Sequence, residues 1–381
     1  MNMSILQANG AHAPCPQTLA QRRALLRWLG AAPLYAVAMP MAFAAANAPA
    51  SALPAKPKAI YLTHADFVRN ALQRHFVPAA QAFAQSSQAL TALWAEPAAT
   101  ATAAWLKQAQ QAWLQTLWDW ETLSAVSVGP LVERRSARKI DFWPTRPAMV
   151  EAAIAAMPQS AAALAQTGAP AKGLPALEWL LWQANPSAAQ LQYAQLLAAE
   201  CAAEAQAIAQ EFGQWFGRIQ HRFEDDEALP VLQEWVGQLA GGLDQLRWKK
   251  MDKPAKSGRA SDWPRATSRA THSSWLATWR GLERLLIGTD PLAPQRTAPE
   301  QTDAMRASFF GLLLGGEHLA GAHALGQAVQ ATAKAMAAAT PKQASSMQAA
   351  LTALGRCKQA VDSHVAQALH IVVGFSDADG D

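Results

Sequence analysis

The sequence predicts an all-α protein, and three observations support this prediction. Ala, Leu and Gln recur throughout the 381 residues, and all three favour helix by intrinsic propensity. Runs of β-branched residues, which favour strands, are nearly absent. Apolar residues, with Trp present 15 times, recur at spacings of three and four along long segments. Because half of the chain is hydrophobic, it can bury one or two sizeable cores.

The first segment, residues 1–44, reads as a cleaved export signal and not as part of the fold. Arg22, Arg23 and Arg27 precede a moderately apolar segment, and small residues offer cleavage options near Ala44–Ala48. The paired arginines resemble a twin-arginine signal, and an arginine pair in an ordinary secretory signal is the alternative. The apolar segment is interrupted by proline and gives no stable membrane anchor. We therefore expect a periplasmic mature protein.

The charge balance gives no reason to expect nucleic acid as a partner. The formal net charge of the chain is +4, and it falls to +1 without the three arginines of the signal. The basic character is therefore mostly that of the signal, and the mature chain has no strong positive field.

Two cysteines remain after cleavage. Cys201 and Cys357 both lie on strongly helical segments, and in an oxidising compartment they can form a disulfide. Nothing in the sequence brings the two together, so two buried free thiols are the simpler interpretation.

After an Ala/Pro-rich linker at residues 45–59, we expect an N-terminal helical bundle over residues 60–222. Helical patterns run over residues 63–94 and 101–126, and a charged loop with a Trp-Pro pair follows at residues 131–147. Shorter helical pieces then lead to the segment GLPALEWLLW. The longest helix begins after Asn185-Pro186, with one core-facing stripe at spacings of three and four: Leu197, Cys201, Ala205, Ile208, Phe212, Phe216 and Ile219.

A rise in polarity near Phe223 predicts a boundary, with a C-terminal helical bundle over residues 223–381. Its expected helices cover residues 227–248, 274–287, 299–330 and 342–373. A long basic Ser/Gly/Pro-rich connection joins the first two, and loops of that length inside a compact fold are often functional. The connection contains SDWP, which echoes DFWP in the first half, and this echo suits two four-helix bundles of similar design.

Common catalytic patterns do not stand out. The chain has no His-Glu-x-x-His pair, no Cys-x-x-Cys and no Gly-x-Ser-x-Gly turn. The densest candidate group is Glu317-His318 with His323, whose spacing places the two rings well apart around a helix, so these read as ordinary histidines.

Glu178 is the most informative candidate, because it is the one carboxylate in a short helix that is otherwise apolar. A buried acid must be protonated, paired or bound to a cation. The structural alternative is an ion pair with an arginine, for example Arg138 or Arg269.

The segment GLPALEWLLW resembles the signature of imelysin-like proteins, a family once classed as metallopeptidases, whose common form is Gly-x-His-x-x-Glu. Further stretches agree in order with that family, and together they span nearly the whole mature chain: FVPAAQAF, GPLVERRSARKIDFWPTRP, SRATHSSW and VVGFSDADGD. The motif carries over as Gly173 and Glu178. It departs at the third position, where Pro175 replaces His, as in a subgroup with GLPALE. Pro175 suits the first turn of a helix.

The resemblance implies two four-helix bundles and a periplasmic protein linked to iron uptake, with a site near the domain interface. By resemblance Glu178 and Gly173 belong to that site, and loop residues are expected to converge on it: Asp141, Trp143, Arg138, Arg269, Ser273 and Ser274. A hard carboxylate site with Glu178 as a metal ligand suits iron, or an iron chelate held by Arg. The implied partners are a metal ion or small iron chelate and other periplasmic iron-uptake proteins.

Three functions remain open from the sequence. The first is a non-catalytic binding protein for iron or an iron chelate. The second is a metal-dependent peptidase, which the loss of the His to Pro175 disfavours because catalytic zinc usually needs three protein ligands. Zinc is for the same reason a less suitable cofactor than iron. The third is an interaction scaffold in which Glu178 only pairs with an arginine across the domain interface.

Overall fold

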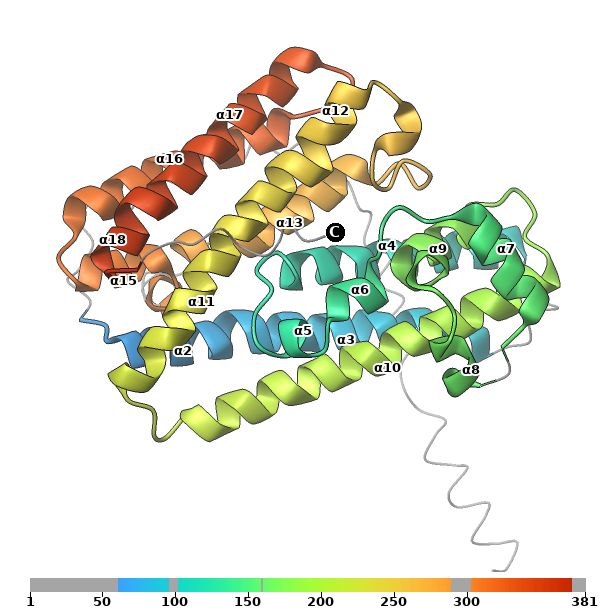
Figure 1. Cartoon of the computed structure of the whole chain (residues 1–381), viewed down its shortest axis with the longest axis horizontal. Helices are drawn as coiled ribbons and strands as arrows, with labels where there is room; N and C mark the ends of the chain where they lie inside the picture. Colours follow the sequence, from blue (N-terminus) through green and yellow to red (C-terminus); the bar gives the residue numbers. More distant parts are fainter. Residues whose placement is uncertain (1–60, 96–101, 159, 289–302, 372–381) are drawn as a thin grey trace, which may run out of the picture. The chain divides into compact units, whose positions relative to one another are not determined.

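The computed structural model describes residues 61–95, 102–158, 160–288 and 303–371, and every regular element in these residues is helical (Figure 1). This confirms the all-α prediction. The predicted signal and the whole predicted linker, residues 1–59, lie outside the described residues. The described helices all belong to one compact unit, residues 47–381.

The first group of helices has α10 as its backbone. The 32-residue α10 (Ala188–Ile219) packs along α3 (Val77–Ala92), and α3 packs against α4 (Ala103–Leu123). The short α9 (Gly173–Leu181) closes the group by contacting both α10 and α4. A Ser187 capping box starts α10, since the Ser187 hydroxyl accepts from the Gln190 N–H while the Gln190 side chain accepts from the Ser187 N–H.

The predicted stripe of α10 is largely confirmed as a core face. Six of its residues are buried, whereas Phe216 is half-buried against the core. The remaining small helices of this half are α2 (His64–Ala71), the π-helical turn η1 (Leu72–Phe76), α5 (Pro130–Glu133), α6 (Ser136–Ile140), α7 (Pro147–Ala156), α8 (Ala161–Ala165) and two 3₁₀ turns, η2 (Leu93–Ala95) and η4 (Ala169–Ala171).

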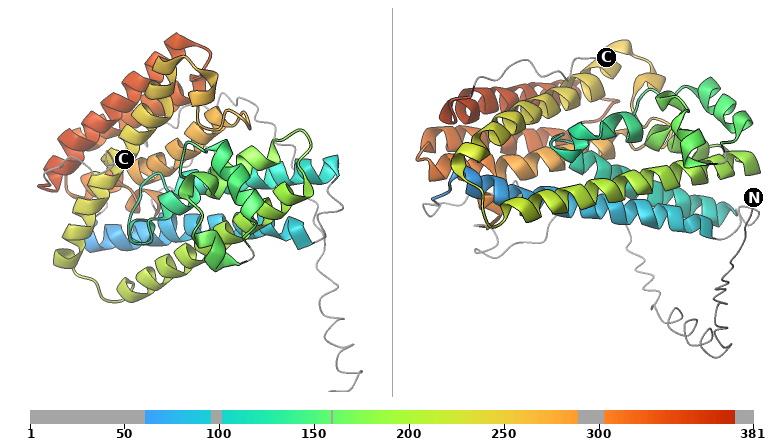
Figure 2. Two further views of the ribbon diagram at one scale, coloured as in Figure 1. Left: turned by 45° about the vertical axis from the view of Figure 1, so that its right-hand side comes forward. Right: turned by 60° about the horizontal axis from the view of Figure 1, so that its bottom comes forward.

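The second group has α16 and α17 packed side by side, with α13 against α16 and α11 against α17 (Figure 2). Its helices are α11 (Asp225–Asp244), the π-helical segment η5 (Gln245–Asp252), α12 (Lys253–Ser257), the 3₁₀ turn η6 (Ala260–Asp262), α13 (Thr271–Ile287), α15 (Phe309–Gly315), α16 (Leu319–Ala338), α17 (Ala344–Ala360), the π-helical turn η7 (Val361–Val365) and α18 (Ala366–Ala368).

The two groups meet where α13 packs against α4. Gly281 on α13 makes this approach possible, since a Cβ there would lie 2.1 Å from the Thr122 carbonyl oxygen. Gly242 on α11 is equally close to the Ala125 carbonyl oxygen. A single hydrophobic core runs through both groups. The two four-helix groups are thus present, and the predicted division at residue 223 into separate domains stays a prediction.

Two predicted elements differ from the structure. The predicted loop at residues 131–147 contains most of the short helices α5 and α6, which are held to α10 by Arg134 pairing with Glu204 and Glu211. The single helix predicted over residues 299–330 is wrong, because α15 ends at Gly315 and α16 begins only at Leu319. Consecutive glycines at 315 and 316 weaken helix propensity there, and Glu317 adopts a left-handed φ of 61°. Residues 299–302 lie outside the described part.

Cys201 and Cys357 are both buried and unpaired, on α10 and α17 respectively. Burial raises the pKa of the Cys201 thiol to about 12, so it stays protonated and unreactive. Within the described ranges no helix is long and apolar enough to cross a membrane.

Candidate functional site

The candidate site begins with α9, which carries the Gly-x-Pro-x-x-Glu segment. Gly173 starts the helix with a φ of 69°, and a Cβ there would lie 2.3 Å from the Ile140 carbonyl oxygen. The start of α9 can therefore lie directly on the end of α6, which brings the next residue, Asp141, to the site. Pro175 lies in the first turn of α9, as expected from its missing N–H.

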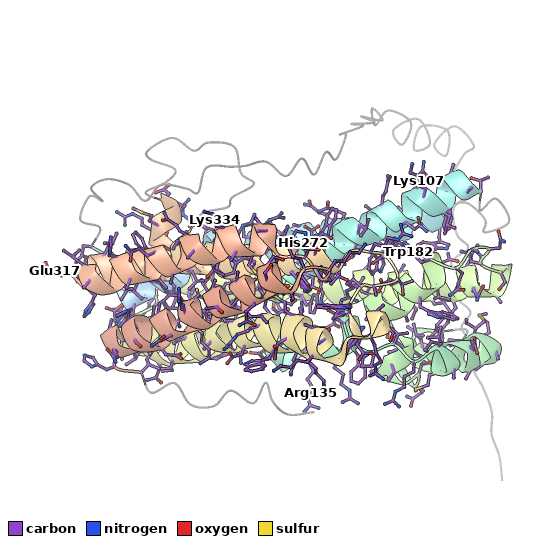
Figure 3. The ribbon with its side chains drawn as sticks, turned by 90° about the horizontal axis from the view of Figure 1, so that it is seen from above. Lys107, Arg135, Trp182, His272, Glu317 and Lys334 are labelled. Carbon is purple, nitrogen blue, oxygen red and sulfur yellow. The ribbon has the colours of Figure 1, made fainter. Side chains whose placement is uncertain are left out.

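Contacts at both ends of α9 hold it against α4. The indole N–H of Trp113 donates to the Leu174 carbonyl oxygen at 3.0 Å, and the Trp113 ring packs edge-on against Trp182. Figure 3 shows Trp182 toward the right-hand side of the view and His272, in the first turn of α13, closer to its middle.

Glu178 is buried, with 6% of its surface exposed, and its partner is a loop serine. Its Oε1 accepts the Ser268 backbone N–H at 2.8 Å and the Ser268 hydroxyl at 2.7 Å. Two hydrogen bonds from one residue satisfy Oε1 of this buried carboxylate and hold the loop that supplies them. The structural alternative of an arginine bonded directly to Glu178 is therefore not what the described residues show.

Ser268 belongs to the α12–α13 connection, residues 258–270, which is the basic Ser/Gly/Pro-rich segment singled out in the sequence. Arg265 and Arg269 both adopt left-handed backbone conformations there, with φ of 64° and 59°. Such conformations cost free energy for residues other than glycine and persist only where surrounding contacts enforce them. The contacts of Ser268 and Arg265 do this, and the Thr271 hydroxyl adds a bond to the Pro264 carbonyl oxygen at 2.7 Å.

Arg265 is the buried cation at the centre of the site, with 2% of its surface exposed. Its Nη2 donates to Asp141 Oδ1 and lies 3.6 Å from Glu121 Oε1, and its guanidinium carbon lies 5.9 Å from the centre of the Trp113 ring. Asp141 Oδ2 accepts from the Trp120 indole N–H at 3.2 Å. The guanidinium thus links the α6–α7 loop, α4 and the α12–α13 connection.

Glu121 on α4 is a second buried carboxylate, with 1% of its surface exposed. Its oxygens accept from the hydroxyls of Ser274 at 2.7 Å and Thr278 at 2.9 Å, both on α13. The Lys250 ammonium of η5 donates to Glu121 Oε2 and to the Thr278 hydroxyl. Glu121 therefore connects the first group of helices to the second through hydrogen bonds as well as packing.

The pKa shifts of Glu121 and Arg265 both favour the charged form of the side chain. Burial alone raises the pKa of Glu121, but the charges of Lys250 and Arg265 outweigh it and hold the pKa below its ordinary value. Burial alone lowers the pKa of Arg265, whereas the carboxylates of Asp141, Glu121 and Glu178 raise it above its ordinary value. Three carboxylates and two cations give this cluster one excess negative charge.

The predicted site residues divide into those that join the cluster and those that do not. Glu178, Gly173, Asp141 and Ser274 belong to it through the contacts given above. Trp143 is 38% exposed, and Ser273 turns its hydroxyl to the Ala270 carbonyl oxygen at 3.0 Å.

The two arginines expected near Glu178 lie at the surface. Arg269 is exposed, and Arg138 is exposed with its guanidinium 5.9 Å from the centre of the Phe142 ring. Within the described residues, Glu178 forms no hydrogen bond or ion pair with either of these arginines. The same holds for Trp143 and Ser273.

Four residues of the cluster were missed by sequence reasoning: Arg265, Glu121, Lys250 and Ser268. A signal existed for three of them. Arg265 directly follows the SDWP echo, and Glu121 follows the core-face Trp120 in a helix with few acids. Ser268 is the first residue of the family-like stretch SRATHSSW, whereas Lys250 stands in polar surroundings where nothing marks it.

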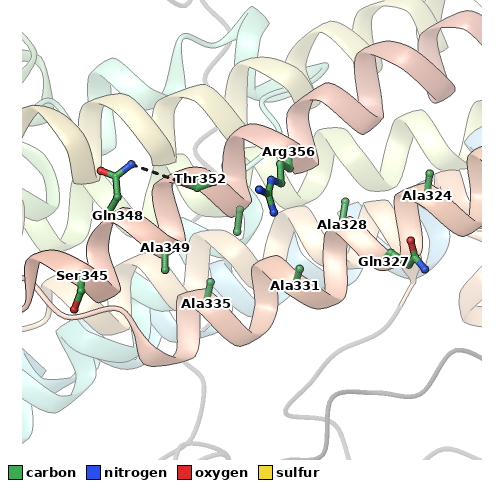
Figure 4. A pocket seen from close by; sticks show the side chains of 11 residues that line it. Ala324, Gln327, Ala328, Ala331, Ala335, Ser345, Gln348, Ala349, Thr352 and Arg356 are labelled. Carbon is green, nitrogen blue, oxygen red and sulfur yellow. Dashed lines mark hydrogen bonds between the residues drawn. The ribbon is translucent and has the colours of Figure 1, made fainter.

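The described residues hold no group of three or more His, Cys, Asp and Glu side chains that could bind a metal ion. Nor does the groove shown in Figure 4 belong to the site. Its volume is about 810 Å³, and its lining comes from α16 and α17 alone, mostly alanines with Arg356 as the charged member.

Similarity to known proteins confirms the resemblance to the imelysin-like family. The imelysin family model, named Peptidase M75, matches residues 73–373. An imelysin-like protein from Psychrobacter arcticum 273-4 has a similar fold, with a TM-score of 0.65 and 17% identity over 83% of this chain and 100% of that one. A protein titled "putative iron-regulated protein A precursor", from Parabacteroides distasonis ATCC 8503, has a TM-score of 0.66 and 13% identity over 83% of this chain and 96% of that one. No curated protein matches the chain. Since the family model covers most of its length, the chain belongs to the imelysin family.

Proposed function

We propose that this protein is a non-catalytic binding protein of iron acquisition that works in the periplasm after removal of its export signal. The observation that carries the proposal is the buried cluster around Glu178 and Arg265. It combines an acid from the family motif with a buried guanidinium, at the place where the α12–α13 connection lies on α9. Buried charges with specific partners are frequent at functional sites.

Two further points support the iron assignment and the location. One structural relative is titled an iron-regulated protein precursor, and the fold is shared with it. The N-terminal arginine pair and apolar segment have the form of an export signal. The partners in this proposal are an iron species and other periplasmic iron-uptake proteins.

A peptidase function receives less support from the residues. The side chain of Pro175 offers neither a metal-binding atom nor a transferable proton. The carboxylates of Glu121 and Asp141 already accept hydrogen bonds from protein donors. A catalytic zinc site usually has three protein ligands and one open position, which this donor set does not offer.

Calorimetric titration of the chain from Ala45 onward tests the proposal. Ferrous iron, ferric citrate and zinc are titrated into the wild type, Glu178→Ala and a control, Glu151→Ala, whose side chain is exposed on α7. We expect binding of an iron species that Glu178→Ala weakens and Glu151→Ala leaves unchanged. Chelator-sensitive cleavage of an unfolded protein substrate would instead support the peptidase.

The scaffold function is the second candidate, and the Glu178–Ser268 bonds favour it because they fix the α12–α13 connection without any ligand. It predicts that Glu178→Ala costs stability, roughly 3–5 kcal/mol if the charge of Arg265 is left under-compensated, and changes no ligand affinity. Absence of binding to all three titrants, with this loss of stability, would favour the scaffold.

A further inference from the structure

The hydrogen-bonding capacity of the cluster is unevenly used, and this imbalance bears on the class of ligand. Both oxygens of Asp141 and both oxygens of Glu121 accept hydrogen bonds from protein donors. Glu178 Oε1 accepts two, so among the six carboxylate oxygens of Asp141, Glu121 and Glu178 only Glu178 Oε2 accepts no hydrogen bond from the described residues. The cluster thus has little acceptor capacity left.

Donors are in excess at the same place. Arg265 engages Asp141 through Nη2, but its Nε and Nη1 are buried and meet no hydrogen-bond acceptor in the described part of the chain. Buried donors are rarely left without a partner, because an unpaired polar group keeps the full cost of its desolvation. What this guanidinium lacks is an acceptor oxygen.

A bare metal ion does not fit this imbalance. An oxygen-preferring cation takes about six oxygen ligands, and one uncommitted carboxylate oxygen is far from such a shell. A simple anion fits poorly as well, because the cluster already carries excess negative charge.

We infer that the site takes a metal–carboxylate chelate, in which carboxylate oxygens of the ligand accept from Arg265 Nε and Nη1 while the metal centre lies toward Glu178. This inference rests on the proposed function and narrows it to one class of cargo. A chelated metal brings most of its own oxygen ligands, so the protein needs to supply only the guanidinium fork and one carboxylate oxygen.

Arg265 Nε and Nη1 are both shielded from solvent, and Arg265 itself belongs to the α12–α13 connection. The connection is fixed to α9 by the two Ser268 bonds and to the α6–α7 loop by Arg265 itself. A ligand reaches these two nitrogens only when neighbouring protein atoms move, and its binding involves the connection because Arg265 is part of it.

The test compares ferric citrate, citrate and ferrous iron by calorimetry on the wild type, Arg265→Lys and Arg269→Lys. Lysine keeps the positive charge and loses the planar fork. Arg269 is the matched control, because it lies in the same connection with the same left-handed backbone but is exposed. We expect ferric citrate to bind more tightly than citrate or ferrous iron, a loss of at least about tenfold in Arg265→Lys, and no change in Arg269→Lys.

The outcomes separate this inference from the proposed function. Two results would contradict the chelate inference and leave the proposed iron-binding function standing. One is ferrous iron that binds as tightly as ferric citrate. The other is an unchanged affinity for ferric citrate in a folded Arg265→Lys variant. No binding of any iron species by the folded wild type overturns both. If Arg265→Lys does not fold by circular dichroism, the order of the wild-type affinities for the three probes alone decides.

Discussion

At the scale of single residues, Glu121 holds more of the structure together than Glu178 does. Its carboxylate neutralises Lys250, lies near Arg265 and accepts from two hydroxyls of α13. Removing one partner of a buried ionic group is costly because the other charge stays buried without compensation. The family motif thus marks the candidate ligand site, whereas the buried acid with the most partners lies outside it.

We expect Glu121→Gln to lower the free energy of unfolding by about 3–5 kcal/mol, because Lys250 and Arg265 lose a buried counter-charge. Urea denaturation followed by circular dichroism measures this. Glu151→Gln, at an exposed position on α7, is the control and should change stability by less than about 0.5 kcal/mol. A loss of that small size in Glu121→Gln would show that the ionic cluster is not needed for stability.

The same carboxylate predicts a pH dependence. The pKa of Glu121 is lower in the folded protein than its ordinary value of 4.5, so its contribution is complete above pH 4.5 and is lost as the pH falls through the folded pKa. The difference in unfolding free energy between wild type and Glu121→Gln should therefore be constant near neutral pH and shrink below about pH 4.5. Denaturation of both proteins at a series of pH values from about 3 to 8 checks this. A stability difference between wild type and Glu121→Gln that grows on acidification would contradict the lowered pKa of Glu121.

Gly173→Ala tests why α9 begins with glycine. The new Cβ would meet the backbone oxygens of Ile140 and Lys139, and the φ of 69° disfavours alanine, so we expect a loss of about 2–4 kcal/mol. Gly213→Ala on α10 is the matched control, because nothing lies within 4 Å of its new Cβ and alanine is the better helix former. Equal stability of the two variants would contradict the close approach of α9 to α6.

At the scale of elements, the sequence predicted helices well and their interruptions poorly. The apolar stripe of α10 is one long local signal, so the helix was readable from residue spacing and its start from the preceding Asn185-Pro186. The break between α15 and α16 depends on a double glycine inside an apolar run, where propensity competes with packing. The short helices α5 and α6 are stabilised by long-range pairs to Glu204 and Glu211, which no local pattern reveals.

Local motifs made some site residues predictable, whereas tertiary contacts decide others. Glu178 and Gly173 belong to a continuous motif, so both could be named. The choice of Arg265 over Arg269 depends on which way a loop with two left-handed residues turns, and only tertiary contacts decide that.

The order of the α12–α13 connection depends on Glu178. Glu178→Ala removes the acceptor of both Ser268 bonds, whereas Glu178→Gln keeps an oxygen that accepts them. We expect faster amide hydrogen exchange over residues 258–270 in Glu178→Ala, clearly less change in Glu178→Gln, and none in Glu151→Ala. Exchange in the connection that is identical in all three proteins would mean that contacts other than Ser268 hold it.

At the scale of the whole compact unit, the structure raises the question of whether the two helix groups unfold separately. They share one hydrophobic core, and their junction combines close glycine contacts with the hydrogen bonds of Glu121. A junction of this kind resembles the interior of a single domain more than a linker between two. We therefore expect cooperative unfolding, even though the chain shows two four-helix groups.

Gly281→Ala tests the junction directly. Its Cβ would lie 2.1 Å from the Thr122 carbonyl oxygen and 2.7 Å from the Ala125 Cβ, so α13 must move away from α4. We expect a loss of at least about 2 kcal/mol, whereas the same substitution at Gly237 on α11, where nothing lies within 4 Å, should be neutral or gain up to about 1 kcal/mol. Tryptophan fluorescence reports on both groups through Trp113, Trp120, Trp235 and Trp275, and circular dichroism reports on all helices. Coincident transitions that shift together in Gly281→Ala indicate one cooperative unit, and two separated transitions would restore the division near residue 223.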